Sequence, residues 1–271
     1  MNQKIYSILI FLLLLTGCDR RDQATVSSHK RVAVTNTYLE CAAKDLLDVE
    51  ILRLSEPGTC PGSFDIRPSQ MNDLRACQIL LRFDFQRGID SKLQHEGLKI
   101  TEIAEVGGPN EPATYLSACR EVAQAFVSLR WMKRDQADAR LSQIETRLKE
   151  KETWVRTEIK RAKLIGCPVI TSIHQQKFCQ WLGMKVTATF RAADTTSIGE
   201  IENAIAAGTT DSAKLVIANL PEGRRTADAL GQRLSAKVIV FENFPVQKNG
   251  KVSFDQMITA NVQSLLATAR R

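Results

Sequence analysis

The chain has 271 residues, of which 44% are hydrophobic and 25% are charged, and its formal net charge is +7. This length is enough for one large domain or for two lobes, each with its own core. The positive charges alternate with acidic residues and are not interleaved with aromatic residues, so the composition does not indicate a nucleic-acid interface.

The chain begins with features that are typical of a bacterial lipoprotein signal. One cation, Lys4, precedes a largely apolar run of about eleven residues, which is too short to span a bilayer. The run ends at Leu15-Thr-Gly-Cys18, which resembles the lipobox that signal peptidase cuts before a lipid-carrying cysteine. We therefore predict a signal peptide at residues 1–17 and a lipid anchor on Cys18. The protein would then be held at the cell membrane, facing the periplasm or the extracellular side. The alternative is an ordinary secretory signal that contains a cysteine.

The first half of the mature chain alternates short apolar segments with segments of helical apolar spacing. Residues 18–30 are polar and have no apolar period, which predicts a flexible tether. After the tether, β-branched and apolar runs predict strands, and amphipathic spacing predicts helices. We expect strands at 32–35, 49–54, 79–83 and 98–106, and helices at 38–47, 68–76 and 113–131.

A long helix is predicted in the middle of the chain. Residues 135–163 contain neither Gly nor Pro, and good helix formers dominate them. A helix of this length is about 45 Å long. Such a helix is long for a small domain and suits a rod between two lobes.

The alternation of strands and helices resumes after this helix. We expect strands at 168–171, 185–190, 214–218 and 237–241, and helices at 174–182, 198–206, 224–234 and 254–267. Strands that alternate with helices imply mainly parallel sheets covered by helices. The predicted fold is therefore α/β, with lobes at 31–134 and 166–271 joined by one long helix at 135–165. Ligands of such sheets bind at the carboxyl ends of strands, so we expect a cleft between the lobes.

Six cysteines follow Cys18, and none of them forms a Cys-x-x-Cys pair. Neither a thioredoxin-type centre nor a zinc ribbon is therefore indicated. In an exported protein we expect one or two structural disulfides and buried thiols for the rest, with the pairing left open. The six are Cys41, Cys60, Cys77, Cys119, Cys167 and Cys179.

Several short segments, taken in their order and spacing, carry a resemblance to a known family. They are Val32-Ala-Val-Thr-Asn36, Phe64-Asp-Ile-Arg-Pro-Ser69, the long helix, Val169-Ile-Thr-Ser172, Leu182-Gly-Met-Lys-Val186, and 254–266 with Asn261. In these features the chain resembles the periplasmic metal-binding lipoproteins of zinc and manganese ABC importers, whose two lobes are joined by a rigid linking helix. The resemblance covers about residues 31–269.

The resemblance implies a set of metal ligands that this sequence keeps only in part. The family usually holds its metal with a His in the Pro-Ser loop, a His after a strand, a His or Glu after the Thr-Ser strand end, and a late Asp or Glu. The first place falls here at Gly62-Ser63, with Cys60 just upstream, and the second at Asn110 with Glu111. Both depart from the family pattern.

The third place is the best retained of the four, and only one of the four usual ligands is kept in kind. His174 follows the Thr-Ser strand end, and Glu222 follows the strand that ends at residue 219. A neutral imidazole from His174 and a thiolate from Cys60, joined by a carboxylate, would suit zinc. The carboxylate would come from Glu222 or Glu111. The alternative is that Cys60 is in a disulfide, that His174 only begins a helix, and that the cleft is degenerate or binds something else.

The resemblance implies a membrane-tethered solute-binding protein of an ABC importer. It would capture zinc or manganese between the lobes and deliver the ion to a permease, without catalysis and without a catalytic cofactor. The second hypothesis is a non-transport envelope lipoprotein of the same fold with a degenerate metal site. An exported enzyme has little support, because the sequence lacks Gly-x-Ser-x-Gly, His-Glu-x-x-His and a glycine-rich phosphate loop.

Overall fold

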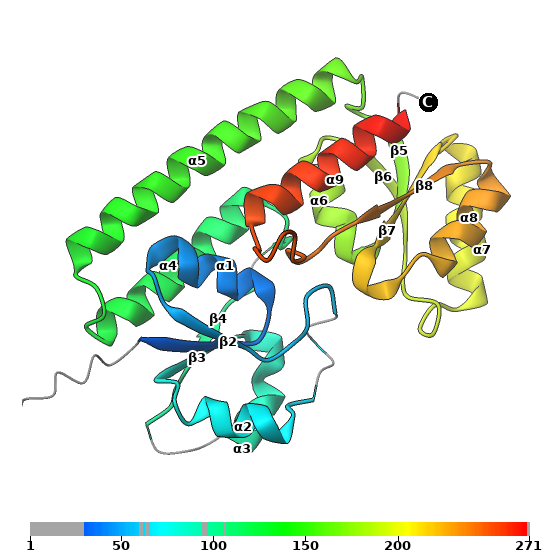
Figure 1. Cartoon of the computed structure of the whole chain (residues 1–271). Coiled ribbons are helices and arrows are strands. Elements are labelled where there is room, and N and C mark those ends of the chain that lie inside the picture. Colours follow the sequence, from blue (N-terminus) through cyan, green and yellow to red (C-terminus); the bar gives the residue numbers. More distant parts are fainter. Residues whose placement is uncertain (1–29, 60–61, 63–64, 94–96, 106, 270–271) are drawn as a thin grey trace, which may run out of the picture.

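The computed structural model describes residues 30–59, 62, 65–93, 97–105 and 107–269. The chain forms two α/β lobes, and the long helix α5 runs between them (Figure 1). Each lobe contains a four-stranded sheet, ordered β2-β1-β3-β4 in the first and β6-β5-β7-β8 in the second, and all neighbouring strands are parallel. The predicted fold class is confirmed. The predicted signal peptide and Cys18 lie outside the described residues, and their roles stay predictions.

The first lobe is built around β1, whose side chains are buried on both faces of the sheet. Val32, Ala33 and Val34 are fully buried, as expected for a strand in a parallel sheet covered by helices. Asn36 then caps the following helix, because its side-chain oxygen accepts hydrogen bonds from the amides of Tyr38 and Leu39. The strands are β1 Arg31–Val34, β2 Glu50–Arg53, β3 Ile79–Phe83 and β4 Lys99–Ile103. The helices are α1 Thr37–Leu46, α2 Pro68–Leu74, α3 Asp90–Leu93 and α4 Pro112–Ser128.

The second lobe repeats this arrangement. Its strands are β5 Pro168–Ser172, β6 Lys185–Phe190, β7 Leu215–Asn219 and β8 Lys237–Phe241. Its helices are α6 Gln176–Trp181, α7 Ile198–Thr210, α8 Arg225–Leu234 and α9 Phe254–Ala269. All predicted strands and helices of both lobes are present, with ends that differ by a few residues. The sequence did not indicate the 3₁₀ turns that follow three strands, at Asp84–Ile89, Ile173–Gln175 and Leu220–Glu222.

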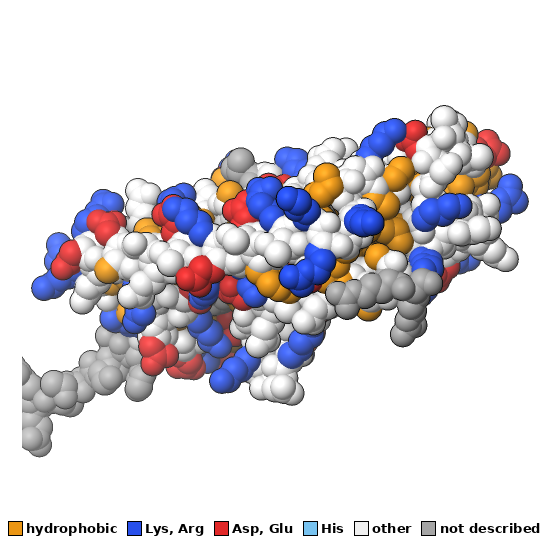
Figure 2. All heavy atoms as spheres, turned by 90° about the horizontal axis from the view of Figure 1, so that it is seen from above, with side chains coloured by type: hydrophobic (Ala, Val, Ile, Leu, Met, Phe, Trp, Pro, Cys, Tyr) orange, Lys and Arg blue, Asp and Glu red, His pale blue; other side chains and the backbone are white. Residues whose placement is uncertain are grey.

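Helix α5 spans Arg134–Arg161 and packs on the lobes along one side. Its buried residues are Ala137, Ile144, Leu148, Val155 and Ile159. The outward side carries charges of both signs, including the pairs Lys149–Glu145 and Arg156–Glu152 one helical turn apart. Figure 2, which views the molecule from the side of α5, shows these charges interspersed over the surface. The long helix is therefore a support for both lobes, as well as a connection.

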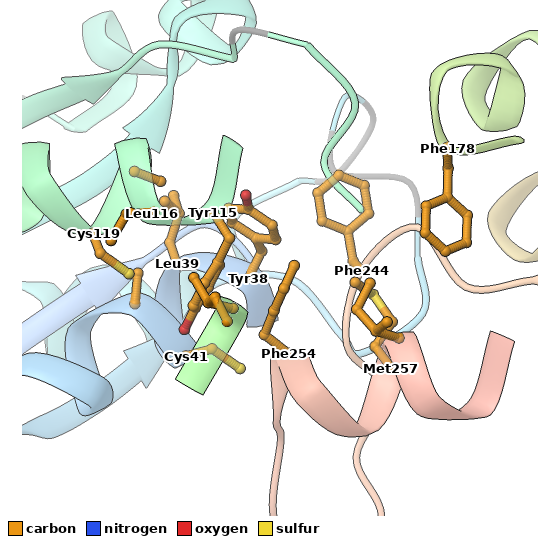
Figure 3. Packing of buried hydrophobic residues seen from close by; sticks show 14 of the residues in the cluster. Tyr38, Leu39, Cys41, Tyr115, Leu116, Cys119, Phe178, Phe244, Phe254 and Met257 are labelled. Atoms are coloured by element: carbon orange, nitrogen blue, oxygen red, sulfur yellow. The ribbon is translucent and has the colours of Figure 1, made fainter. Parts of the chain in front are cut away.

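An aromatic cluster joins the two lobes into one core. Tyr38 of α1 and Tyr115 of α4 belong to the first lobe, and Phe254 of α9 belongs to the second (Figure 3). The rings of Tyr115 and Phe254 stack with centroids 4.0 Å apart and an interplanar angle of 7°. Tyr38 meets both rings edge-on, at 5.2 Å and 5.9 Å. All three side chains are buried, and they belong to one apolar cluster that extends through both lobes.

A half-buried arginine, Arg147, connects the same elements through ion pairs. Arg147 of α5 donates hydrogen bonds to both carboxylate oxygens of Asp45, at 3.1 Å and 2.5 Å. Its Nε also lies 3.1 Å from a carboxylate oxygen of Asp255 in α9, and Tyr115 donates its hydroxyl to Asp45 at 2.7 Å. Hydrogen bonding to Asp45 raises the pKa of Arg147. The lobes and α5 thus share a charged contact beside the aromatic one.

The expectation of structural disulfides is wrong for the described cysteines. All five, Cys41, Cys77, Cys119, Cys167 and Cys179, are free thiols, so the expected disulfides do not form among these five. Four are buried in the apolar clusters of the lobes, where a cysteine packs as a small hydrophobic residue. Burial raises the pKa of Cys77 to about 11 and that of Cys179 to about 12. Cys60 lies outside the described residues.

The shared core leads to a stability prediction. We expect Phe254→Ala to lower the free energy of unfolding by about 3–5 kcal/mol, because it removes a stacked ring from the contact between the lobes. Urea denaturation measures the change. Phe85→Ala is the control, because Phe85 is 47% exposed and should cost much less. Equal losses for the two variants would contradict a core shared by the lobes.

Candidate functional site

A cleft of about 290 Å³ lies between the lobes, at the carboxyl ends of strands from both sheets. The first lobe contributes side chains or backbone that follow β2, β3 and β4, and the second contributes residues at the ends of β5, β7 and β8. The lining residues are Gly62, Phe85, Glu105, His174, Asn219, Pro221, Glu222, Asn243 and Phe244. The predicted cleft between the lobes is therefore confirmed.

His174 and Glu222, two of the predicted metal ligands, face each other in this cleft. His174 is in the 3₁₀ turn after β5, and Glu222 is in the turn after β7. Because β5 and β7 are neighbours in the sheet, their ends meet, and Nε2 of His174 lies 3.5 Å from Oε1 of Glu222. The His174 side chain is 57% exposed, whereas that of Glu222 is 15% exposed. The imidazole is thus accessible to a solute.

Ser172, the last residue of β5, positions both members of this pair. Its hydroxyl donates a hydrogen bond to Oε2 of Glu222 at 2.5 Å and accepts one from the amide of His174 at 3.2 Å. The serine is fully buried. Glu222 therefore presents its other carboxylate oxygen toward the imidazole.

Glu105 lies on the first-lobe side of the same cleft and was not singled out from the sequence. Partial burial raises the pKa of its carboxyl group and the nearby Asp84 raises it further, while His174 and Lys177 act in the opposite direction. The predicted strand 98–106 contained Glu105, but β4 ends at Ile103, which places the residue in a loop after the strand. The signal that could have identified it is its position near a strand end.

The other predicted carboxylate, Glu111, does not line the cleft. It stands at the N-cap of α4, and its side chain turns back toward Gly107 and Gly108. Burial raises the pKa of Glu111, and a hydrogen bond from the amide of Gly108 lowers it in part. Of the two carboxylates considered from the sequence, Glu222 is the one that the fold brings beside His174. Cys60 lies outside the described residues, although Gly62 near it lines the cleft.

A network of buried amides connects the lobes behind the cleft. Asn110, from the first lobe, donates hydrogen bonds to Oε1 of Gln175 at 3.0 Å and to the backbone carbonyl of Glu242 at 2.9 Å. Gln175 in turn donates to the side-chain oxygens of Asn219 and Asn243, at 3.1 Å and 2.9 Å. All four amide side chains are buried. The network holds the lobes together by polar contacts that need no metal ion.

Comparison with known proteins identifies the family. The sequence profile of the periplasmic zinc-uptake complex component A family, ZnuA, matches residues 32–268. The chain belongs to this family. No curated protein is similar enough in sequence to count as a match.

Solved structures agree with this assignment at the level of the fold. The manganese-bound periplasmic metal binding protein from Candidatus Liberibacter asiaticus is 11% identical, with a TM-score of 0.76, and the match covers 89% of this chain and 99% of that one. The periplasmic zinc binding protein TroA from Treponema pallidum is 14% identical, with a TM-score of 0.73 and the same coverage. A cadmium-bound form of the first protein also matches, with a TM-score of 0.76.

Two of the four places that the resemblance led us to expect as metal ligands offer none of the expected histidines. The first falls at Gly62, which has no side chain to offer a metal. At the second place the side-chain amide of Asn110 donates both of its hydrogen bonds to residues of the other lobe. Among the described residues, no group of three or more His, Cys, Asp or Glu side chains is placed to hold one metal ion. His174 and Glu222 remain as a pair.

The amide network leads to a prediction about the cleft's support. We expect Gln175→Ala to lower the free energy of unfolding by about 2–3 kcal/mol, because it removes the hydrogen bonds that Gln175 donates to the buried oxygens of Asn219 and Asn243 and one of the two that Asn110 donates. Thermal or urea denaturation measures the loss. Gln180→Ala, at an exposed position of α6, is the matched control and should change stability little. A loss no larger than that of the control would show that the network does not hold the lobes.

Proposed function

We propose that this protein is the solute-binding component of an ABC importer, which captures zinc or manganese in the interlobe cleft and passes it to a permease. The pair formed by His174 and Glu222 is the observation that carries the proposal. It stands at the carboxyl ends of β5 and β7, where α/β sheets bind their ligands. Membership of a family named for zinc uptake supports the same function.

The separation of the two side chains suits zinc. With Zn–N and Zn–O distances of about 2.0–2.1 Å and a tetrahedral angle, the two ligand atoms would be about 3.3 Å apart. Nε2 of His174 and Oε1 of Glu222 are 3.5 Å apart, so a small closing movement brings them into range. The hydrogen bond from Ser172 orients Glu222, as partners of metal-ligating carboxylates commonly do. A thiolate from Cys60 would complete a set that zinc prefers.

The membrane anchor belongs to the same proposal. The lipobox at Leu15-Thr-Gly-Cys18 would give a lipid-anchored protein after removal of residues 1–17, with residues 18–30 as its tether. Among the described residues, no helix combines the length and the apolar character that a membrane span requires. In this proposal a lipid on Cys18 holds the protein at the membrane that contains its permease.

A second candidate function is supported by the departures from the family's ligand set. Gly62 offers no ligand, and Asn110 is committed to the amide network. A non-transport envelope lipoprotein of the same fold would need the lobes held together but would not need a metal. The amide network supplies such a link.

Metal binding separates the two candidates. We expect zinc to raise the melting temperature of the purified protein, and His174→Ala or Glu222→Gln to weaken zinc binding at least about tenfold, which corresponds to about 1.4 kcal/mol. Isothermal titration calorimetry measures the affinity, and manganese is titrated in parallel. His95→Ala is the control for an imidazole that the proposal does not use. Cys60→Ser, tested under reducing conditions, reports whether the thiolate takes part.

One outcome favours the second candidate. If neither zinc nor manganese stabilises the protein under reducing or oxidising conditions, metal capture by this cleft is excluded. Zinc binding that is unchanged in His174→Ala would equally contradict the proposed ligands.

A further inference from the structure

The cleft is larger and more apolar than a bare ion requires. Its volume of about 290 Å³ is at the lower end of the range of pockets that hold small organic molecules. Zinc needs four donors in a closed site. The described residues place only two donors in the cleft, His174 and Glu222. The cleft therefore has room for a ligand that brings further donors to the metal.

Aromatic side chains form part of the wall beside this pair. Phe85 is 47% exposed, and its ring stacks on Phe83 with centroids 5.4 Å apart and an interplanar angle of 19°. Phe244 is held from behind by Tyr38 and Phe83, at 6.3 Å and 6.2 Å. Phe85 and Phe244 both line the cleft. The exposed ring of Phe85 offers a surface on which a planar organic group can stack, whereas Phe244 is 6% exposed and only borders that surface.

The charge of the wall favours a cationic guest. Glu105 and Glu222 both line the cleft, and Glu105 makes no ion pair within the described part of the chain. A complex of divalent zinc with a neutral chelator keeps the positive charge of the metal. Its metal end would be attracted by the carboxylates, and its organic end would contact the ring of Phe85.

We propose that the cleft takes its metal as a complex with a small planar chelator that carries aromatic or heteroaromatic rings. His174 and Glu222 would occupy two positions of a four-coordinate metal and the chelator the other two, and the waters bound to the free complex would be released. The rings of the chelator would lie against the exposed ring of Phe85. This inference rests on the proposed function, because it requires that His174 and Glu222 bind metal.

Calorimetry with three probes tests the inference on the purified full chain. The probes are zinc chloride alone, 1,10-phenanthroline alone, and the one-to-one complex of zinc with 1,10-phenanthroline. We expect the complex to bind at least about tenfold more tightly than zinc alone, and phenanthroline alone to bind much more weakly than the complex. A tenfold gain is near the upper end of what one additional stacked aromatic contact contributes.

Two variants assign the binding energy to the two parts of the cleft. His174→Ala should weaken the binding of both zinc and the complex. Phe85→Ala should weaken the binding of the complex more than the binding of zinc alone, and so remove most of the preference for the complex. The matched control is Ile198→Ala, at an apolar position that is 78% exposed and does not line the cleft.

The possible failures can be told apart. If zinc alone binds as tightly as the complex, the inference is overturned and the proposed function stands. Tight binding of zinc alone that falls in Cys60→Ser would mean that a thiolate completes the site, and it would also overturn the inference. Phenanthroline that binds equally well without zinc would overturn it too. If no probe binds, both the inference and metal capture fail.

Discussion

The stacked contact between Tyr115 and Phe254 is the constraint on which the rest of the structure depends. It joins a helix of the first lobe to the last helix of the second, with the rings 4.0 Å apart and buried. Phe244, a wall of the cleft, belongs to the same aromatic cluster through Tyr38. Widening the cleft would therefore expose part of the core, so the cleft is largely preformed. The binding of a solute needs to supply little energy for closure.

The polar side chains of the cleft follow the carboxyl ends of parallel strands. Neighbouring strands β5 and β7 bring His174 and Glu222 together, and Ser172 holds the carboxylate. Buried amides around Gln175 connect the lobes at Asn110, a place where the resemblance led us to expect a metal ligand. The chain thus has the fold of its family, with the lobes joined by polar contacts between its own side chains.

Much of the fold could be predicted from the sequence, because each element has a local signature. β-Branched runs such as Val32–Val34 marked buried strands, and the absence of Gly and Pro marked α5. Contacts between distant segments had no such signature, so the stacking of Tyr115 on Phe254 was missed. At the site, His174 and Glu222 could be placed by the strand ends that they follow. Glu105 was not identified, because the predicted strand 98–106 was too long and included this residue.

One other expectation was wrong for a physical reason. Disulfides were expected from the number of cysteines, but the five described thiols are free and four of them pack in the core as small apolar side chains.

Native-state hydrogen exchange in increasing urea tests the central claim most directly, which is that both lobes share one core. The slowest amides of β1 and β7 should report the same free energy of opening, within about 1 kcal/mol. A clearly lower value for one lobe would contradict the shared core.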